Sequence, residues 1–422
     1  MEIKEKVSLH ELVKNNSIKE IIENINEVDD IDHRDSNGCT PLMVAVQLNN
    51  LAIAKVLIDN GADVNARDVN MLTPYLCAGA NGFHELLSLT LSAGADVNSV
   101  NRFGGTPLLP SSEKGFLRTV QVSLNAGIPV NHVNQLGWSA LLESVILGDG
   151  GYLYSDIVEV LISSGADIHL KDRNGLSALD YAKKLDQKHI VDLMEDGDSI
   201  KSQYTKSLQL IKRHIQNFDY EAALDVLNEN KHDFPDEVIY FYYYGYVLTE
   251  LKRYDESIIA YRKGLTASEG KVEFYLYIAN SYRLNKKAEE ALIEFDNGIS
   301  SDPGNDFIRY HKSNYLRELG MHCEAVEEMT TLLKQQPQRY DFSFHKANSL
   351  RTLGLHEEAI SAIENAITHD CGNALYHLHK AQSLELIGRY QQALMIIDNA
   401  LLICDEQSDL IKYKDRLSNL MA

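Results

Sequence analysis

Apolar residues along this chain recur at helical spacing, separated by short polar turns. In a stretch such as "IAKVLI" (53–58), the apolar side chains fall on one side of a helix. Only 8 prolines interrupt the 422 residues, so helices can run unbroken between the turns. The pattern predicts a protein built from many amphipathic helices.

A regular repeat runs through the first half of the chain. Thr40, Thr73, Thr106 and Ser139 are evenly spaced, and each Thr precedes a proline. The hydroxyl can cap a helix whose first turn accepts the proline. The second helix of each unit ends at a glycine that we expect in the left-handed conformation: Gly61, Gly94, Gly127 and Gly165. Asp and Asn then turn the chain into a hairpin.

The units at either end, and the fourth unit, differ from the others. We expect residues 9–33 to form a degenerate N-terminal cap and residues 174–194 to form the last unit. The fourth unit is five residues longer because of "GDGGYLYS" (148–155), which we expect to be a mobile loop between its helices. A phosphate cradle is the alternative for this segment, but neither G-x-G-x-x-G nor G-K-[ST] is present.

The repeat becomes one position longer in the second half. Small residues recur in two columns, which are Ala223, Ser257, Ala291, Ala325, Ala359, Ala393 and Gly245, Ala279, Ser313, Ala347, Ala381. Two helices can cross closely only where side chains are small. We expect six helix pairs over residues 204–405, and residues 407–422 then predict a capping helix that is polar on one side.

The 33-residue units of the first half resemble ankyrin repeats, and the 34-residue units of the second half resemble tetratricopeptide (TPR) repeats. The two resemblances cover nearly the whole chain and imply an all-α fold of two tandem solenoids. The ankyrin-repeat domain is expected over residues 1–198. The TPR domain with its C-terminal capping helix is expected over residues 199–422. The junction falls at "EDGDS" (195–199).

In the TPR family, positions 5, 9 and 12 of the first helix line a concave groove that binds a peptide or a protein. The aromatic run 240–246 lies on such a helix, and we expect it to split between core positions (Phe241, Tyr244) and groove positions. The candidate partner-binding residues in these columns are Tyr242, Tyr246, Asn280, Arg283, Tyr310, Asn314, Arg317, Phe344, Asn348 and Arg351.

Asn and Arg at positions 9 and 12 share a helix face and suit peptide recognition. An Asn amide can donate and accept, as a peptide backbone requires, and Arg offers a fork for carboxylates. Two alternatives stay open. The columns can form an ordinary solvated face whose arginines pair with neighbouring acids, or the partner can contact another surface.

The ankyrin half offers three further candidate residues. Trp138, the only tryptophan, starts a first helix at a position that commonly faces the concave surface. Tryptophan is enriched in binding hot spots, and the alternative is burial against the next unit. Arg102 and Phe103 lie at the preceding hairpin tip.

The sequence contains no pattern typical of catalysis or of a metal site. His311, His345 and His379 recur one helix pair apart, which is too far to share a metal ion. The five cysteines lack C-x-x-C spacing, which favours a reducing compartment. No nucleophile elbow, zinc-protease or kinase signature occurs. We therefore expect no enzyme, metal or cofactor.

The net charge of −21 disfavours nucleic acid, because phosphate binding needs clustered Lys and Arg. It favours a basic partner surface at the ankyrin face, and the groove arginines favour acidic segments. "MEIKEKVSLHELV" has no apolar core of a signal peptide, so a cytoplasmic location with no membrane contact is expected. The predicted function is a non-enzymatic adaptor or scaffold. The alternative is an inhibitor or immunity protein that sequesters an enzyme or toxin.

Overall fold

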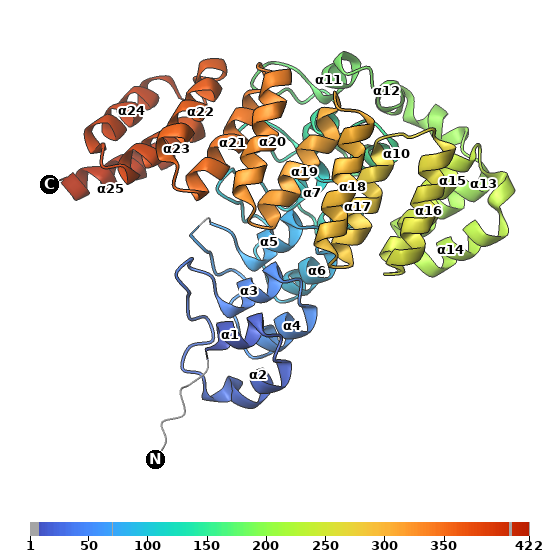
Figure 1. Ribbon diagram of the computed structural model, residues 1–422, viewed down its shortest axis with the longest axis horizontal. Helices are drawn as coiled ribbons and strands as arrows, with labels where there is room; N and C mark the ends of the chain where they lie inside the picture. The colour runs from blue at the N-terminus through green and yellow to red at the C-terminus, as the bar shows by residue number, and fades with distance from the viewer. Residues whose placement is uncertain (1–7, 70, 405–406, 422) are drawn as a thin grey trace. The chain divides into compact units, whose positions relative to one another are not determined.

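A computed structural model describes residues 8–69, 71–404 and 407–421 of the chain. It contains two compact units, residues 1–200 and 201–422 (Figure 1). The described residues form 25 α-helices and no β-strand, with two isolated bridges, Val133 to Ser139 and Lys171 to Ser177. This confirms the all-α prediction.

The N-terminal unit consists of helix pairs stacked in sequence order. Its helices are α1 (Leu9–Lys14), α2 (Ile18–Asn24), the 3-10 turn η1 (Ile25–Glu27), α3 (Pro41–Gln47), α4 (Leu51–Asp59), α5 (Pro74–Ala80), α6 (His84–Ser92), α7 (Leu108–Glu113), α8 (Leu117–Asn125), α9 (Ala140–Ile146), α10 (Tyr152–Ser163) and α11 (Ala178–Lys184). The first helices pack on one another in order, from α1 to α3 and onward to α11. The second helices do the same from α2 to α10. Helix α12 (Lys188–Ser202) follows, with non-helical backbone at Asp196.

The predicted caps explain where most first helices begin. The Thr40 hydroxyl accepts from the Met43 N–H at 3.2 Å, and Thr73 caps α5 in the same way. Thr106 is the exception, because α7 begins only at Leu108 and the Thr106 hydroxyl has no hydrogen-bond partner among the described residues. At the other end of each unit, the four predicted glycines all have φ between 80° and 92°, which confirms the left-handed turn.

Half of the insertion in the fourth unit is helical, which corrects the expectation of a mobile loop. Residues 147–151 lie between α9 and α10, and α10 starts at Tyr152, so the second half of "GDGGYLYS" is helical. Tyr154 is buried, and its hydroxyl donates to the Glu113 carbonyl oxygen at 2.7 Å. The aromatic side chain therefore holds this segment against the preceding unit.

The C-terminal unit contains six helix pairs and a final single helix. Its elements are α13 (Lys206–Gln216), α14 (Tyr220–Glu229), η2 (Lys231–Asp233), α15 (Glu237–Glu250), α16 (Tyr254–Ala267), α17 (Glu273–Leu284), α18 (Ala288–Ser301), α19 (Asp306–Glu318), α20 (His322–Gln335), α21 (Tyr340–Thr352), α22 (His356–His369), α23 (Ala374–Leu386), α24 (Tyr390–Ile403) and α25 (Ser408–Met421). Each helix packs against the next along the chain. The first helices α17 and α19 also contact each other, as do α23 and α25.

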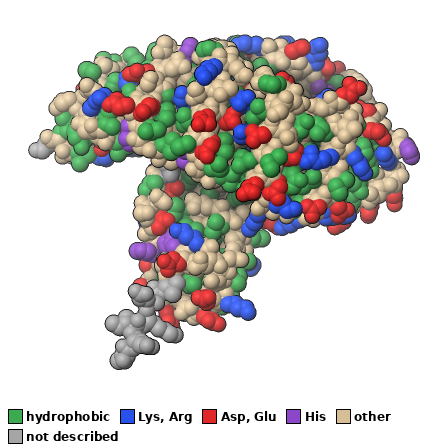
Figure 2. Space-filling view, in the orientation of Figure 1, with side chains coloured by type: hydrophobic (Ala, Val, Ile, Leu, Met, Phe, Trp, Pro, Cys, Tyr) green, Lys and Arg blue, Asp and Glu red, His purple; other side chains and the backbone are tan. Residues whose placement is uncertain are grey.

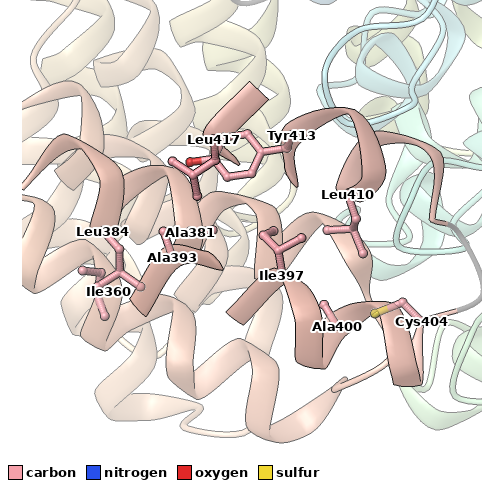
Figure 3. Close-up of a cluster of buried hydrophobic side chains, with 10 residues drawn as sticks. All are labelled: Ile360, Ala381, Leu384, Ala393, Ile397, Ala400, Cys404, Leu410, Tyr413 and Leu417. Atoms are coloured by element: carbon pink, nitrogen blue, oxygen red, sulfur yellow. The ribbon is translucent and has the colours of Figure 1, made fainter. Parts of the chain in front are cut away.

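The small-residue column of the second helices lies at the helix crossings. All six residues from Ala223 to Ala393 are buried, with at most 1% of their surface exposed. Figure 3 shows the last of these crossings, where Ala381 and Ala393 lie among Leu384, Ile397 and the inward side of α25. The repeat of the second half therefore marks the positions where backbones approach most closely.

Candidate functional site

The aromatic run 240–246 is helical, within α15, but its groove-facing rings are buried. Tyr242 is completely buried, and its ring centroid lies 5.4 Å from that of Tyr277 on the next first helix. Tyr246 is also buried. Tyr244, expected in the core, is only half-buried and donates to Asn228 Oδ1 at 3.2 Å. The predicted division is confirmed for Phe241, which is buried, and is wrong for Tyr242, Tyr244 and Tyr246. Tyr242 is buried because its ring packs against Tyr277 of the following unit.

The other two aromatic residues expected at position 5 of a first helix, Tyr310 and Phe344, are also not available to a partner. Tyr310 and Phe344 are both buried. The Tyr310 ring stacks 5.6 Å from Phe342, and Phe344 lies 5.0 Å from Tyr376. Each ring contacts the following first helix, so this column holds adjacent units together and presents no ring to a partner.

The position-12 arginines also connect successive first helices. Arg283 Nε donates to both carboxylate oxygens of Glu318 at 3.0 Å. Arg351 donates to Gln382 Oε1 at 2.6 Å. Arg317 donates to His345 Nδ1 at 3.1 Å and also bonds Asn314. We call these bonds the inter-repeat ladder.

The Arg317 bonds differ from the Arg283 bonds of the inter-repeat ladder because they include no carboxylate. Arg317 bonds only neutral groups, with no carboxylate at ion-pair distance in the described part of the chain. Burial, with the Arg317 charge, lowers the pKa of the nearby His322. Because Arg317 must donate to Nδ1 of His345, that imidazole is neutral in this arrangement. The rung therefore holds an uncompensated positive charge.

Asn348 lies one helical turn beyond His345 on α21. Its side chain is buried, and neither its amide oxygen nor its amide nitrogen has a hydrogen-bond partner among residues 8–69, 71–404 and 407–421. Asn314 is buried as well, whereas Asn280 is half-buried. A buried amide without partners is costly, by about 1–3 kcal/mol per group. Arg317, His345 and Asn348 form what we call the α19–α21 site.

The structure separates the three ankyrin candidates. Trp138 is buried, so the expectation that it faces a partner is wrong, and its position before α9 places the ring inside the stack. Arg102 and Phe103 are half-buried at their hairpin tip. The Arg102 guanidinium lies 4.7 Å from the centroid of the Phe103 ring. Of the three residues, Arg102 and Phe103 are the two that are not buried.

A buried carboxyl group in the ankyrin unit escaped the sequence analysis. Glu143 on α9 is buried, and only its Oε1 accepts a hydrogen bond, from Asn134 at 2.8 Å. Burial, together with the nearby Glu113 charge, raises the pKa of Glu143 well above its usual range. Its place within an apolar stretch, "ALLESVI", was the available signal.

Glu143→Gln is expected to stabilise the N-terminal unit at neutral and alkaline pH by about 1–2 kcal/mol. The folded pKa exceeds the unfolded pKa, so the native state binds the proton more tightly. The free energy of unfolding therefore falls as pH rises from the unfolded pKa through the folded pKa. Because a glutamine side chain carries no titratable proton, the variant does not lose this stability. Denaturant unfolding between about pH 5 and pH 8 should show that the free energy of unfolding depends less on pH in the variant than in the natural protein. Glu23→Gln, at an exposed position, is the control and should leave the slope unchanged.

The described residues provide no metal centre or spanning helix. No group of three or more His, Cys, Asp or Glu side chains among them could hold a metal ion. None of their helices is long and apolar enough to cross a membrane. On the face drawn in Figure 2, basic and acidic side chains are interspersed.

Family comparisons agree with the two repeat types. The model described as "Ankyrin repeat" matches residues 37–69, and "Ankyrin repeats (3 copies)" matches residues 75–172. Models described as "Tetratricopeptide repeat" match residues 240–270, 312–373 and 346–409. A model described as "CRISPR-associated protein Csm6 6H domain" matches residues 202–240, which contain α13 and α14. The chain belongs to the ankyrin-repeat proteins in its N-terminal half and to the TPR proteins in its C-terminal half.

Two similar solved structures are ankyrin proteins. An ankyrin repeat domain from Acinetobacter baumannii AYE is 45% identical, with a TM-score of 0.43, and the match covers 44% of this chain and 95% of that one. A second ankyrin repeat protein is 38% identical, with a TM-score of 0.44, over 44% of this chain and 96% of its own. None of the curated proteins matches the chain. Repeats of both kinds generally serve as protein–protein interaction modules.

Proposed function

We propose that this protein is a non-enzymatic adaptor whose C-terminal unit binds an acidic, extended peptide segment at the α19–α21 site. The observation that carries the proposal is the pairing of an uncompensated charge on Arg317 with the unpartnered amide of Asn348. A carboxylate would compensate the guanidinium, and a peptide bond would supply a donor and an acceptor to the amide.

The bonds that Arg283 and Arg351 already make determine which residues are available to a partner. Arg283 already binds Glu318, and 7% of its side chain is exposed, so its role is to join two units. Arg351 binds the neutral Gln382 and adds a second positive charge beside Asn348 on the same helix. Access to the buried amide requires the Arg317 and Arg351 side chains to exchange their present partners for the peptide.

At the ankyrin unit, Arg102 and Phe103 are the proposed contact residues for a folded partner. The guanidinium stacked on the ring offers a flat, partly apolar surface together with a charge. An inhibitor that blocks a basic enzyme or toxin is the alternative function, favoured by the net charge of −21. A search for basic proteins encoded beside this one, followed by a salt titration of binding, separates the two roles.

Arg317→Gln and Asn348→Ala are each expected to weaken peptide binding, Arg317→Gln by about tenfold to a hundredfold because one charge-assisted hydrogen bond contributes roughly 1.5–3 kcal/mol. The probe is a displayed library of random acidic peptides, selected on the full chain and then measured by fluorescence anisotropy. Far-UV circular dichroism and the melting temperature should stay near those of the natural protein.

Arg389→Gln is the matched control for the charge change. Arg389 is exposed, directly precedes α24 and bonds Glu357 on α22, so it is not part of the α19–α21 site. It should leave peptide affinity unchanged. A library that yields no acidic peptides, or peptides that bind Arg317→Gln as tightly as the natural protein, contradicts the proposal.

A further inference from the structure

An ion pair recurs where consecutive helix pairs of the 201–422 unit meet. Its base is a lysine on the first helix of one pair, and its acid lies on the second helix of the preceding pair. The lysines share one register position of the repeat, and the acids share another. These lysine–carboxylate pairs are Lys312 with Asp296 at 2.7 Å, Lys380 with Glu364 at 2.9 Å and Lys414 with Asp398 at 2.7 Å.

The lysine–carboxylate pair is missing between α20 and α21. Lys346 on α21 occupies the register position of the three paired lysines, but Thr330 on α20 stands where the acid is expected. Lys312 has a second acid, Glu328, at 2.7 Å, and the counterpart of Glu328 one repeat later is Ala362. In the part of the chain that the structure describes, Lys346 has no carboxylate at ion-pair distance.

A second base lies near Lys346 in place of an acid. Lys334 follows Thr330 by one helical turn, on the same face of α20. The residues at the register position of Lys334 in the adjacent units are Ser300 and Thr368, which carry no charge. Burial and the charge of Lys334 both lower the pKa of Lys346. The contact between α20 and α21 therefore combines two like charges, whereas the lysine–carboxylate pairs combine opposite ones.

The protonation state of a lysine decides whether it can act as a nucleophile. Only the neutral amine has a free electron pair, and burial or a neighbouring cation favours that form. Burial also acts on Lys312, but the bonds to Asp296 and Glu328 outweigh it and raise the pKa of Lys312. Lys312, Lys346 and Lys380 are all half-buried, so they are similar in exposure and differ in their partners.

We propose that Lys346 is a site of covalent acylation by acyl phosphates. Its neutral Nζ attacks the carbonyl carbon of the donor, the bond from that carbon to the phosphate oxygen breaks, and phosphate leaves. One proton of the amine passes to the departing phosphate, and an amide remains on Lys346. The amide carries no charge, so the product no longer repels Lys334. Acylation of Lys346 requires no ligand at the α19–α21 site.

Acetylation rates measured for each lysine test the proposal. The full chain is incubated with acetyl phosphate at mildly alkaline pH, and mass spectrometry follows the peptides that contain Lys312, Lys346 and Lys380. Lys346 is expected to react at least about threefold faster than the other two, because one pKa unit changes the neutral fraction about tenfold and the weaker basicity of the amine cancels part of that gain. Equal or slower acetylation of Lys346 overturns the proposal.

Thr330→Asp isolates the effect of the missing acid. It introduces a carboxylate at the register position of the acids, so it should pair with Lys346 and lower its acetylation rate to that of the paired lysines. Far-UV circular dichroism should match that of the natural protein, since aspartate occupies the same position in α18 and α24. An unchanged rate at Lys346 in this variant contradicts the proposal.

Thr331→Asp is the matched control on the same helix. The Thr330 hydroxyl donates to the Val326 carbonyl oxygen and the Thr331 hydroxyl to that of Glu327, so the two threonines make the same local bond. Consecutive residues of a helix point in different directions, so the added charge does not face Lys346. The control should leave the acetylation rate of Lys346 near that of the natural protein. A decrease as large as that in Thr330→Asp overturns the proposal.

Lys334→Gln tests the same arrangement without adding a charge, and it decides the matter if Thr330→Asp does not fold. Lys334 is exposed, so the fold should tolerate the change. Removal of the second positive charge is expected to slow the acetylation of Lys346 by about twofold, because the Lys346 amine then keeps its proton more readily. A rate that stays the same contradicts the proposal.

Discussion

Replacing Gly79 with alanine is expected to destabilise the N-terminal unit by about 2–3 kcal/mol, near the upper end for overpacking of a helix crossing. Gly79 lies near the end of α5, against the start of α7. A Cβ atom there would lie 2.2 Å from Pro107 Cβ and 2.9 Å from Pro107 Cα. Because one of these atoms is backbone, relief requires α5 and α7 to separate, and the helix propensity gained by alanine offsets only part of the loss.

Hydrogen exchange of peptides from α5 and α7, measured beside denaturant unfolding, is the appropriate test. Both peptides should lose protection together, because each repeat depends on contact with its neighbours. Gly197→Ala is the control in the same unit, since a Cβ there meets no atom within 4 Å. Equal stability of the two variants would show that α5 and α7 do not pack as closely as described.

Gly245→Ala is expected to destabilise the C-terminal unit by about 1–3 kcal/mol for the corresponding reason. Gly245 occupies the small-residue position of α15, and a Cβ there would lie 2.5 Å from Cδ1 and Cε1 of Tyr261. Tyr261 is buried on α16, so its ring has little room to move. Loss of protection in α15 and α16, with a lower unfolding midpoint, is the expected measurement.

A double-mutant cycle separates this clash from a general effect of alanine on the helix. In a Tyr261→Leu background, the cost of Gly245→Ala should fall by about 1 kcal/mol or more, because the two side chains compete for one volume. Gly304→Ala is the second comparison, since a Cβ there meets only Asp302 Oδ1, at 3.7 Å. Additive effects at residues 245 and 261 would contradict the proposed crossing.

The fold could be predicted from the sequence because repeat units place the same physical requirement at the same register position. Gly245 and the alanines of the second helices mark close crossings, and Thr40 and Thr73 mark helix starts. Thr106 shows the limit of this reasoning. The same Thr-Pro pair stands there, yet the helix starts one residue later and leaves the hydroxyl unused.

The candidate site was less predictable, because exposure depends on how consecutive units pack. Tyr242, Tyr310 and Phe344 occupy register positions that the family uses for binding, but each has an aromatic neighbour on the following first helix. The position of a residue within its repeat does not reveal that it has such an aromatic neighbour in the following unit. It also does not reveal that Glu318 lies opposite Arg283, whereas Arg317 faces a neutral imidazole.

The inter-repeat ladder has a mechanical consequence. Each hydrogen bond or ion pair of the inter-repeat ladder connects one helix pair to the next. The rotation between two consecutive helix pairs, and with it the superhelical pitch, is therefore fixed separately at each contact. The contact between α17 and α19 contains an ion pair, Arg283 with Glu318, whereas Arg317 of α19 bonds only a neutral imidazole on α21. A peptide that captures Arg317 and Arg351 would release the hydrogen bonds on both sides of α21, so bending would be concentrated between α19 and α23, while the Arg283 and Glu318 ion pair would still join α17 to α19.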